Sequence, residues 1–270
     1  KSMRSASSST YTGVEMRPLR TDPSRNVLAN TLALLPDFWA CNSRLWREGP
    51  FAHVFVEPGC DDSGLPIGAA LYLHHNVLDQ PALPRGAASP YLGVAVTAKQ
   101  IERALRDAGE HIRFEPCADP AASAAEDLVA DRVVGWFEGR SEIGPRALGH
   151  RSILADARRA ANWARVNRVK GREAWRPFAP AVLESEALTW FEGLPVPSPY
   201  MLFNAQVRSD QIPAVTHVDG SARVQTVSAE CGQFFDLLQA FHRKTGVPVV
   251  LNTSFNGPGE PIVERPQDAI

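Results

Sequence analysis

Four segments of the 270-residue sequence carry side chains suited to binding anions. The first is GRSEIGPRALGHRS (139–152), where Gly144, Gly149 and a proline mark a turn that bears Arg146 and Arg151. Glycine permits backbone conformations closed to other residues and proline stiffens a turn, so both arginines can be presented in a fixed direction. Their planar guanidinium groups match the paired oxygens of a phosphate or a carboxylate.

The second segment is VKGREAWRPFAP (169–180), where Lys170, Arg172 and Arg176 surround Trp175 just before an expected strand. Lysine offers a point charge and arginine a bidentate grip, a combination expected around a polyphosphate. In the alternative interpretation Trp175 is a core residue, and the three cationic side chains lie in solvent at the edge of that core.

Two more segments supply polar groups near strand ends. THVDGSARVQTV (216–227) places His217, Asp219 and Arg223 around an Asp-Gly turn, where His217 could equally be structural. VPVVLNTSFNGPGEPIV (247–263) reads as a buried strand ending in hydroxyl and amide groups, which can bind a phosphate or a carbonyl without adding charge. These groups belong to Asn252, Thr253, Ser254 and Asn256.

The distribution of charge supports an anion site more than the net charge does. The whole chain carries a formal charge of −2, yet residues 139–176 hold ten Lys or Arg against the acids Glu142, Asp156 and Glu173. A solvated helix face would explain such a run. Because Arg146 and Arg151 lie on turns with glycine and proline, a phosphate site is the sharper hypothesis.

Composition excludes several classes of protein. The chain is 44% hydrophobic and has no apolar run near the roughly 20 residues of a membrane helix, so we expect no membrane partner. Its four cysteines form no CxxC pair, which predicts neither a zinc site nor a disulfide framework and favours a cytoplasmic location. Residue 1 is not methionine and the chain stops at RPQDAI, a helix just beginning, so we expect a piece of something longer.

Hydrophobic periodicity supplies the elements that must position these groups. Residues 79–93 read as a linker, and alternating helices and strands follow, which predicts a mixed α/β (α+β) fold beginning near residue 112. The predicted helices are 65–78, 97–109, 121–131, 157–168, 186–192 and 231–245. The predicted strands are 53–58, 133–139, 178–183, 200–207, 222–228 and 247–255.

The order of the quoted segments closely resembles the C-terminal domain of the O-carbamoyltransferases of the NodU/CmcH type. The resemblance covers residues 112–270 and implies a YrdC-like twisted-sheet domain that binds ATP and makes an acyl adenylate. Carbamoyl phosphate and ATP, helped by Mg²⁺, would give carbamoyl adenylate. The carbamoyl group would then pass to a hydroxyl of a small acceptor, as in antibiotic and other secondary-metabolite biosynthesis.

The same resemblance assigns roles to individual residues. Five fall on motif positions that hold carbamoyl phosphate and the ATP phosphates: Arg146, Lys170, Arg176, Arg223 and Ser254. Four more are expected to contribute to nucleotide binding: Arg151, Arg172, Asn256 and His217. We see no protein nucleophile, so catalysis should depend on positioning and charge stabilisation.

Residues 1–111 resemble the end of an actin-like (ASKHA) transfer domain. Asp62 falls on a metal-ligand position that would hold Fe²⁺, although Asp62 could instead cap the helix that follows. His74 and His75 are expected at the surface of that helix.

The chain departs from the family pattern in this part. The HxxxH that supplies other metal ligands is absent, and LALLPDF (32–38) replaces a Gly-Gly-x-Ala turn. Either the missing half lies upstream or on a partner chain, or the transfer site has decayed.

Two other functions fit parts of the sequence. A threonylcarbamoyl-adenylate synthase serving tRNA modification shares the YrdC fold but is not expected to carry GPRALG joined to an actin-like tail. A nucleotide- or RNA-binding module without turnover would explain the basic charge. Because aromatic and basic residues do not interleave at strand spacing, we expect no nucleic-acid partner.

Overall fold

The computed structural model of this chain describes residues 27–28, 39–50, 53–59, 61–81 and 89–270. The predictions for the first thirty residues, apart from 27–28, lie outside this part. So do LALLPDF, Cys60 and the middle of the predicted linker. Among the described residues, no helix is long and apolar enough to cross a membrane.

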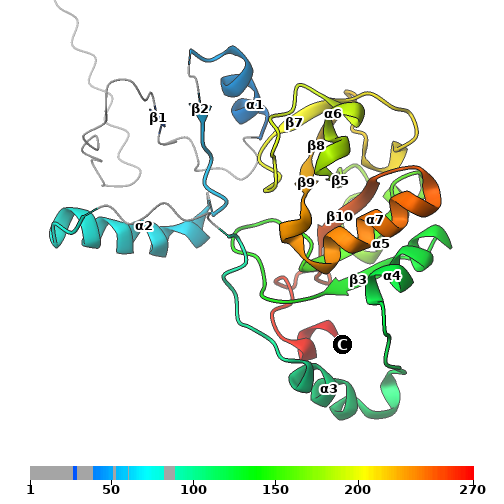
Figure 1. Cartoon of the computed structure of the whole chain (residues 1–270). Coiled ribbons are helices and arrows are strands. Elements are labelled where there is room, and N and C mark those ends of the chain that lie inside the picture. The colour runs from blue at the N-terminus through cyan, green and yellow to red at the C-terminus, as the bar shows by residue number, and fades with distance from the viewer. Residues whose placement is uncertain (1–26, 29–38, 51–52, 60, 82–88) are drawn as a thin grey trace, which may run out of the picture.

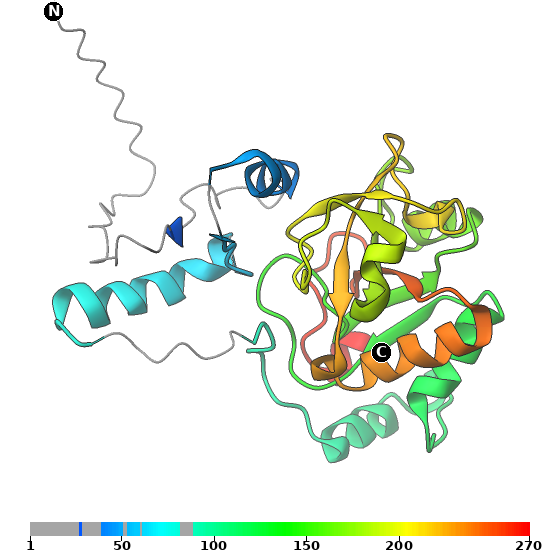
Figure 2. The same cartoon turned by 45° about the horizontal axis from the view of Figure 1, so that its top comes forward.

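The N-terminal part contains little sheet. Strand β1 (Val27–Leu28) pairs in parallel with β2 (His53–Val54), so the strand predicted over 53–58 is wrong beyond its first two residues. Helix α1 (Trp39–Glu48) was not predicted. Helix α2 (Leu65–Tyr72) continues through a π-helical turn to Val77, as predicted, and extends away from the sheets in both views (Figures 1 and 2).

Two predicted helices begin at side-chain caps. Helix α3 (Ala98–Asp107) starts at Thr97, whose hydroxyl accepts the Gln100 N–H while the Gln100 side chain accepts the Thr97 N–H. Helix α4 (Pro120–Val129) starts at Asp119, whose carboxylate accepts a backbone N–H of the first turn. Both helix predictions are confirmed.

The centre of the molecule is a five-stranded sheet in the order β3-β4-β10-β5-β9. Its strands, in chain order, are β3 (Val134–Phe137), β4 (Arg151–Asp156), β5 (Ala179–Leu183), β9 (Gln225–Val227) and β10 (Val249–Ser254). Within this sheet, only β5 and β9 pair in parallel. A second, antiparallel sheet holds β6 (Phe191–Glu192), β7 (Asn204–Val207) and β8 (Ser221–Arg223).

Each face of the larger sheet buries its own core because successive strand residues point to opposite sides. Leu154 and Val250 face α4 and α7 (Gln233–Thr245), which lie side by side (Figure 1). Ile153 and Leu251 face α5 (Ala161–Val169), α6 (Ala187–Trp190) and the smaller sheet. The predicted α+β class is confirmed. The division at residue 112 and the likeness to actin-like proteins stay predictions.

Some predicted elements need correction. Strand β4 was missed, and because it extends to Asp156 the helix predicted from 157 begins only at Ala161. The strand predicted over 222–228 divides at Val224 into β8 and β9, which belong to different sheets. The helix predicted over 186–192 is confined to α6, since the chain enters β6 at Phe191.

Candidate functional site

The loop between β3 and β4 carries Arg146 and depends on its glycines. Gly144 and Gly149 have φ angles of +92° and +107°, in the region that side chains disfavour. A Cβ atom at Gly149 would lie 2.1 Å from the ring of Phe234, and one at Gly144 would lie 2.7 Å from the carbonyl oxygen of Pro58. The predicted need for glycine at these positions is confirmed.

A small open pocket of about 70 Å³ lies beside this loop. The predicted residues Arg146, Arg172, Arg223 and Ser254 all line it. No acidic residue is among its described lining, which is completed by Pro145, Ala147, Pro177, Phe178, Ala179, Met201, Asn252 and Thr253. The fold thus brings all four sequence segments together to make a positively charged pocket.

Lys170 closes α5 and lies against the end of β10. Its ammonium donates to the Ser254 carbonyl (2.7 Å) and hydroxyl (3.1 Å), to the Asn256 carbonyl (3.0 Å) and to Oδ1 of Asn256. Burial, and next the charge of Arg172, lower the pKa of Lys170 to about 8. Lys170 therefore holds the polar turn after β10, and a phosphate would have to replace one of these bonds.

Arg172 is held by side chains of its own region. Its Nε donates to Oδ1 of Asn167 at 2.7 Å, and its guanidinium carbon lies 4.3 Å from the centre of the Phe178 ring. Burial, and next the charge of Arg176, lower the pKa of Arg172 to about 10. Arg176 itself is half exposed, lies 3.7 Å from Glu173 and does not line the pocket.

His217 lies next to the pocket rather than in its lining. Its Nδ1 is 3.4 Å from the hydroxyl of Ser221, and its ring forms a T-shaped pair with Trp39 with 5.9 Å between the ring centres. Burial is the main cause that lowers the pKa of His217, against an opposing effect of Asp219. This arrangement favours a neutral imidazole within the turn before β8.

Arg151 lies away from the pocket, inside the fold. It is fully buried, its guanidinium donates to backbone carbonyls of Glu138, Gly139, His150 and Glu264, and its cationic plane lies 3.7 Å over the Phe137 ring. The geometry argues against the nucleotide contact predicted for it, because these donors are already bound within the protein. Arg151 instead joins the start of β4 to the strand β3.

The predicted metal ligand Asp62 is exposed at the start of a short 3₁₀ helix. Its neighbour Asp61 caps that turn by accepting the Ser63 N–H, so the alternative role of Asp62 as a helix cap is wrong. No group of three or more His, Cys, Asp or Glu in the described part of the chain could hold a metal ion. These residues alone do not fit an iron site, and we derive no step through one.

Gln225 escaped the sequence predictions, and Asn252 was predicted as an anion-binding group without its role in holding the loop. Asn252 donates to the Ala147 carbonyl at 3.2 Å and Gln225 to the Leu148 carbonyl at 2.7 Å, and the two amides also bond to each other. A buried amide in an apolar strand was the available signal. Glu142, the acid in the basic loop, was counted only as a charge.

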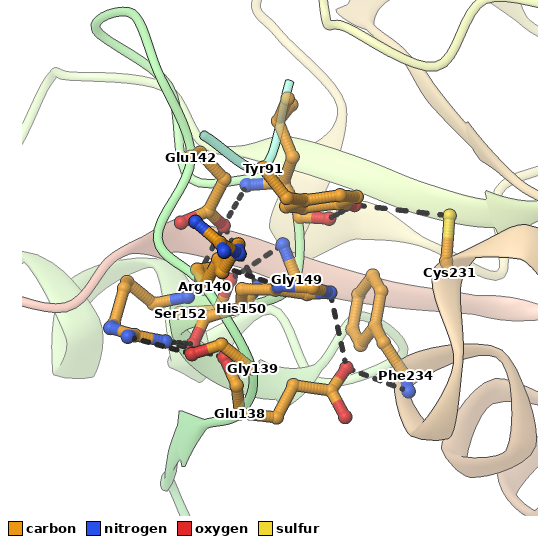
Figure 3. A network of polar contacts seen from close by, with 12 residues as sticks. Tyr91, Glu138, Gly139, Arg140, Glu142, Gly149, His150, Ser152, Cys231 and Phe234 are labelled. Carbon is orange, nitrogen blue, oxygen red and sulfur yellow. Dashed lines mark hydrogen bonds and ion pairs between the residues drawn. The ribbon is translucent and has the colours of Figure 1, made fainter. Parts of the chain in front are cut away.

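The far side of the loop faces the chain segment that leads into α3. The Tyr91 ring stacks on His150 with 3.6 Å between ring centres, and its hydroxyl donates to the Leu148 carbonyl at 3.1 Å (Figure 3). Nearby, Glu138 accepts the Phe234 N–H, and burial raises the pKa of Glu138 to about 7. The loop is therefore enclosed on one side and open to the pocket on the other.

Comparisons with known proteins show the family of this chain. Residues 125–270 match the family model described as carbamoyltransferase C-terminus. The chain is 46% identical to nodulation protein NolNO of Sinorhizobium fredii, over 85% of this chain and 35% of that protein. It is 37% identical to the 3'-hydroxymethylcephem-O-carbamoyltransferase of Streptomyces clavuligerus, over 85% of this chain and 42% of that protein.

A solved structure of full-length HypF is also similar, at 18% identity and a TM-score of 0.40, over 58% of this chain and 20% of that one. The chain spans less than half the length of the curated relatives NolNO and the cephem carbamoyltransferase. The resemblance inferred from the motifs is confirmed, and the chain belongs to the carbamoyltransferase family, with residues 125–270 matching its C-terminal region.

Proposed function

We propose that the pocket binds ATP and carbamoyl phosphate and forms carbamoyl adenylate. The supporting observation is that Arg146, Arg172 and Arg223 converge with Ser254 on a pocket without acids, in a chain of the carbamoyltransferase family. ATP and carbamoyl phosphate together carry several negative charges, which must be neutralised before they can react side by side.

The reaction balances with one water molecule. Water cleaves carbamoyl phosphate into carbamate and phosphate, and a carbamate oxygen then attacks the α-phosphorus of ATP. The bond from that phosphorus to the bridging oxygen breaks, and pyrophosphate leaves with the electron pair. The arginines stabilise charge that develops on the phosphate oxygens, which suits groups fixed before the reaction. Because no acid lines the pocket in the described residues, Mg²⁺ would arrive bound to the ATP phosphates.

The second half of the proposal is transfer of the carbamoyl group to a hydroxyl of a small acceptor. One relative's name, 3'-hydroxymethylcephem-O-carbamoyltransferase, supports an alcohol as the acceptor class. Asp62 and its surroundings do not complete a transfer site in the described residues, so this step is proposed for the complete enzyme.

The adenylating step is tested by pyrophosphate release from the full chain given ATP, Mg²⁺ and carbamoyl phosphate. We expect release only when all three are present, and a 10²- to 10³-fold loss in Arg146→Ala. Arg165→Ala, which removes an exposed arginine of α5 paired with Asp131, is the control for loss of one positive charge. Release that does not need carbamoyl phosphate, or that survives in Arg146→Ala, would contradict the proposal.

A further inference from the structure

Glu142 lies under the loop that carries Arg146, and in the described residues its hydrogen bonds all go to the backbone of that loop. One carboxylate oxygen, Oε1, accepts the N–H groups of Leu148 (2.7 Å), His150 (2.8 Å) and Arg151 (3.2 Å) (Figure 3). Glu142 is 8% exposed, and its other oxygen has no hydrogen-bond partner in the described part of the chain. A carboxylate with three amide donors forms stronger bonds than a neutral acceptor would.

These bonds connect the chain before Arg146 to the chain after it. Arg146 lies between Glu142 and the three donors in sequence, so the carboxylate ties the two ends of the turn together. The tie adds to the stiffness of the proline in the turn, because Gly144 and Gly149 allow the backbone on either side more conformations than other residues would. The strap Pro90–Gly93 adds a second tie, since Ile143 N–H donates to the Pro90 carbonyl and Gly93 N–H to the Ser141 carbonyl.

The carboxylate also compensates charge beneath the loop. Burial lowers the pKa of Arg151, and the negative charge of Glu142 is the largest opposing effect. Glu142 does not line the pocket, so it is not placed to exchange protons with a substrate there. Its contacts fit a group that sets backbone geometry.

We propose that Glu142 is a positioning residue whose carboxylate fixes Arg146 for anion binding, and that it acts on the reaction only through Arg146. This inference rests on the proposed function of the pocket. It predicts that loss of the Glu142 charge matters while Arg146 is present and has no further effect once Arg146 is removed.

The test is a double-mutant cycle of the full chain with Glu142→Gln, Arg146→Ala and both together. Glutamine keeps the shape, and its amide oxygen can still accept from the three N–H donors, but these bonds lose the strength that the negative charge gives them. We expect Glu142→Gln to raise KM for carbamoyl phosphate or lower pyrophosphate release by about 10- to 100-fold, the loss typical of a misplaced group. In the Arg146→Ala background the same change should alter the rate less than about twofold.

A second readout needs no turnover. We expect amide hydrogen exchange at Leu148, His150 and Arg151 to quicken in Glu142→Gln while the amides of β10 stay protected. Asp156→Asn is the matched control, because Asp156 is equally a buried carboxylate but pairs with Arg158 at the far end of β4. It should leave exchange in the loop and the KM unchanged.

Two results would overturn the inference: losses that multiply in the double variant, as for a general loss of stability, or unchanged exchange at the three amides. A wild-type chain that releases no pyrophosphate would count against the proposed function instead. Binding of inorganic pyrophosphate by the same four proteins, with the exchange measurement, would then still decide whether Glu142 positions Arg146.

Discussion

The β3–β4 loop and the segment between α5 and β5 both bring arginines to the pocket, but they are held differently. In the loop, Glu142, Gln225 and Asn252 bond to the backbone around Arg146. In the α5–β5 segment the charged side chains themselves make the stabilising contacts, as in the hydrogen bond that Arg172 donates to Asn167. We infer that the loop keeps its shape without its arginine, whereas the segment needs its charged side chains to stay folded.

The largest effect is expected where the loop backbone cannot adapt. Gly149→Ala should lower the free energy of unfolding by about 3 kcal/mol or more, because the new Cβ would lie 2.1 Å from Phe234 at a φ of +107°. Gly246→Ala is the control: its φ is +72°, but nothing lies within 4 Å of its Cβ, so about 1 kcal/mol is expected. Chemical denaturation measures both, and equal losses would show that backbone strain alone accounts for Gly149.

Replacement of Asn167 should destabilise the α5–β5 segment most. This buried amide accepts from Arg172 and donates to the carbonyls of Ala174 and Arg176. Asn167→Ala should cost about 2–3 kcal/mol, since it leaves buried polar groups unsatisfied. Urea unfolding with Arg165→Ala as the control from the same helix gives the comparison, and a loss below about 0.5 kcal/mol would mean that other contacts hold the segment.

The two arginines should separate stability from anion binding. Arg172→Ala is expected to lower the free energy of unfolding by about 1.5 kcal/mol, since it removes a bond to Asn167 and the stack on Phe178. Arg146→Ala should change the same quantity by less than about 0.5 kcal/mol, while both variants weaken pyrophosphate binding. Calorimetric titration and thermal unfolding measure the pair. A larger loss of stability in Arg146→Ala than in Arg172→Ala would contradict the difference inferred between the loop and the segment.

The smallest effect is a pH dependence from Lys170, whose pKa burial lowers to about 8. Between about pH 8 and the pKa of an unfolded lysine near 10.4, the folded state binds fewer protons than the unfolded state. This group alone therefore adds stability as pH rises through that window. Anion binding should weaken as pH rises through the same window, because the Lys170 side chain loses its positive charge.

Lys170→Arg checks this assignment, since arginine keeps its proton throughout that range. We expect the decline in pyrophosphate binding near pH 8 in the wild-type chain and not in the variant. A decline at the same pH in both proteins would assign it to another group.

Much of the fold followed from local pattern. The helix predicted from Thr97 and the glycines of the loop followed from sequence because their signals are local and strong. Strand β4 was missed because RSILAD follows a glycine-rich turn and is buried on both faces, so it lacks the alternation of a half-buried strand. The division at Val224 depends on which sheet each half joins, which is a long-range property.

The sequence predicted which residues line the pocket better than it predicted which groups they contact. Arg146, Arg172, Arg223 and Ser254 meet at one pocket, and their roles stay predictions. Arg151 has the same residue type as Arg146 and lies in the same sequence motif, and its packing against Phe137 and four carbonyls at the start of β4 distinguishes it. Sequence spacing cannot tell which arginine of a turn faces inward, because that depends on the strands behind it.

The strap Pro90–Gly93 affects how the protein could be divided for study. A fragment beginning at residue 112, where the repeating pattern of helices and strands starts, would lack Tyr91 and the carbonyl partners of Ile143 and Arg140. The underside of the arginine loop would then meet water, with His150 unstacked. A shortened version intended to retain the pocket should therefore start before Ser89, so that the strap folds with the sheet.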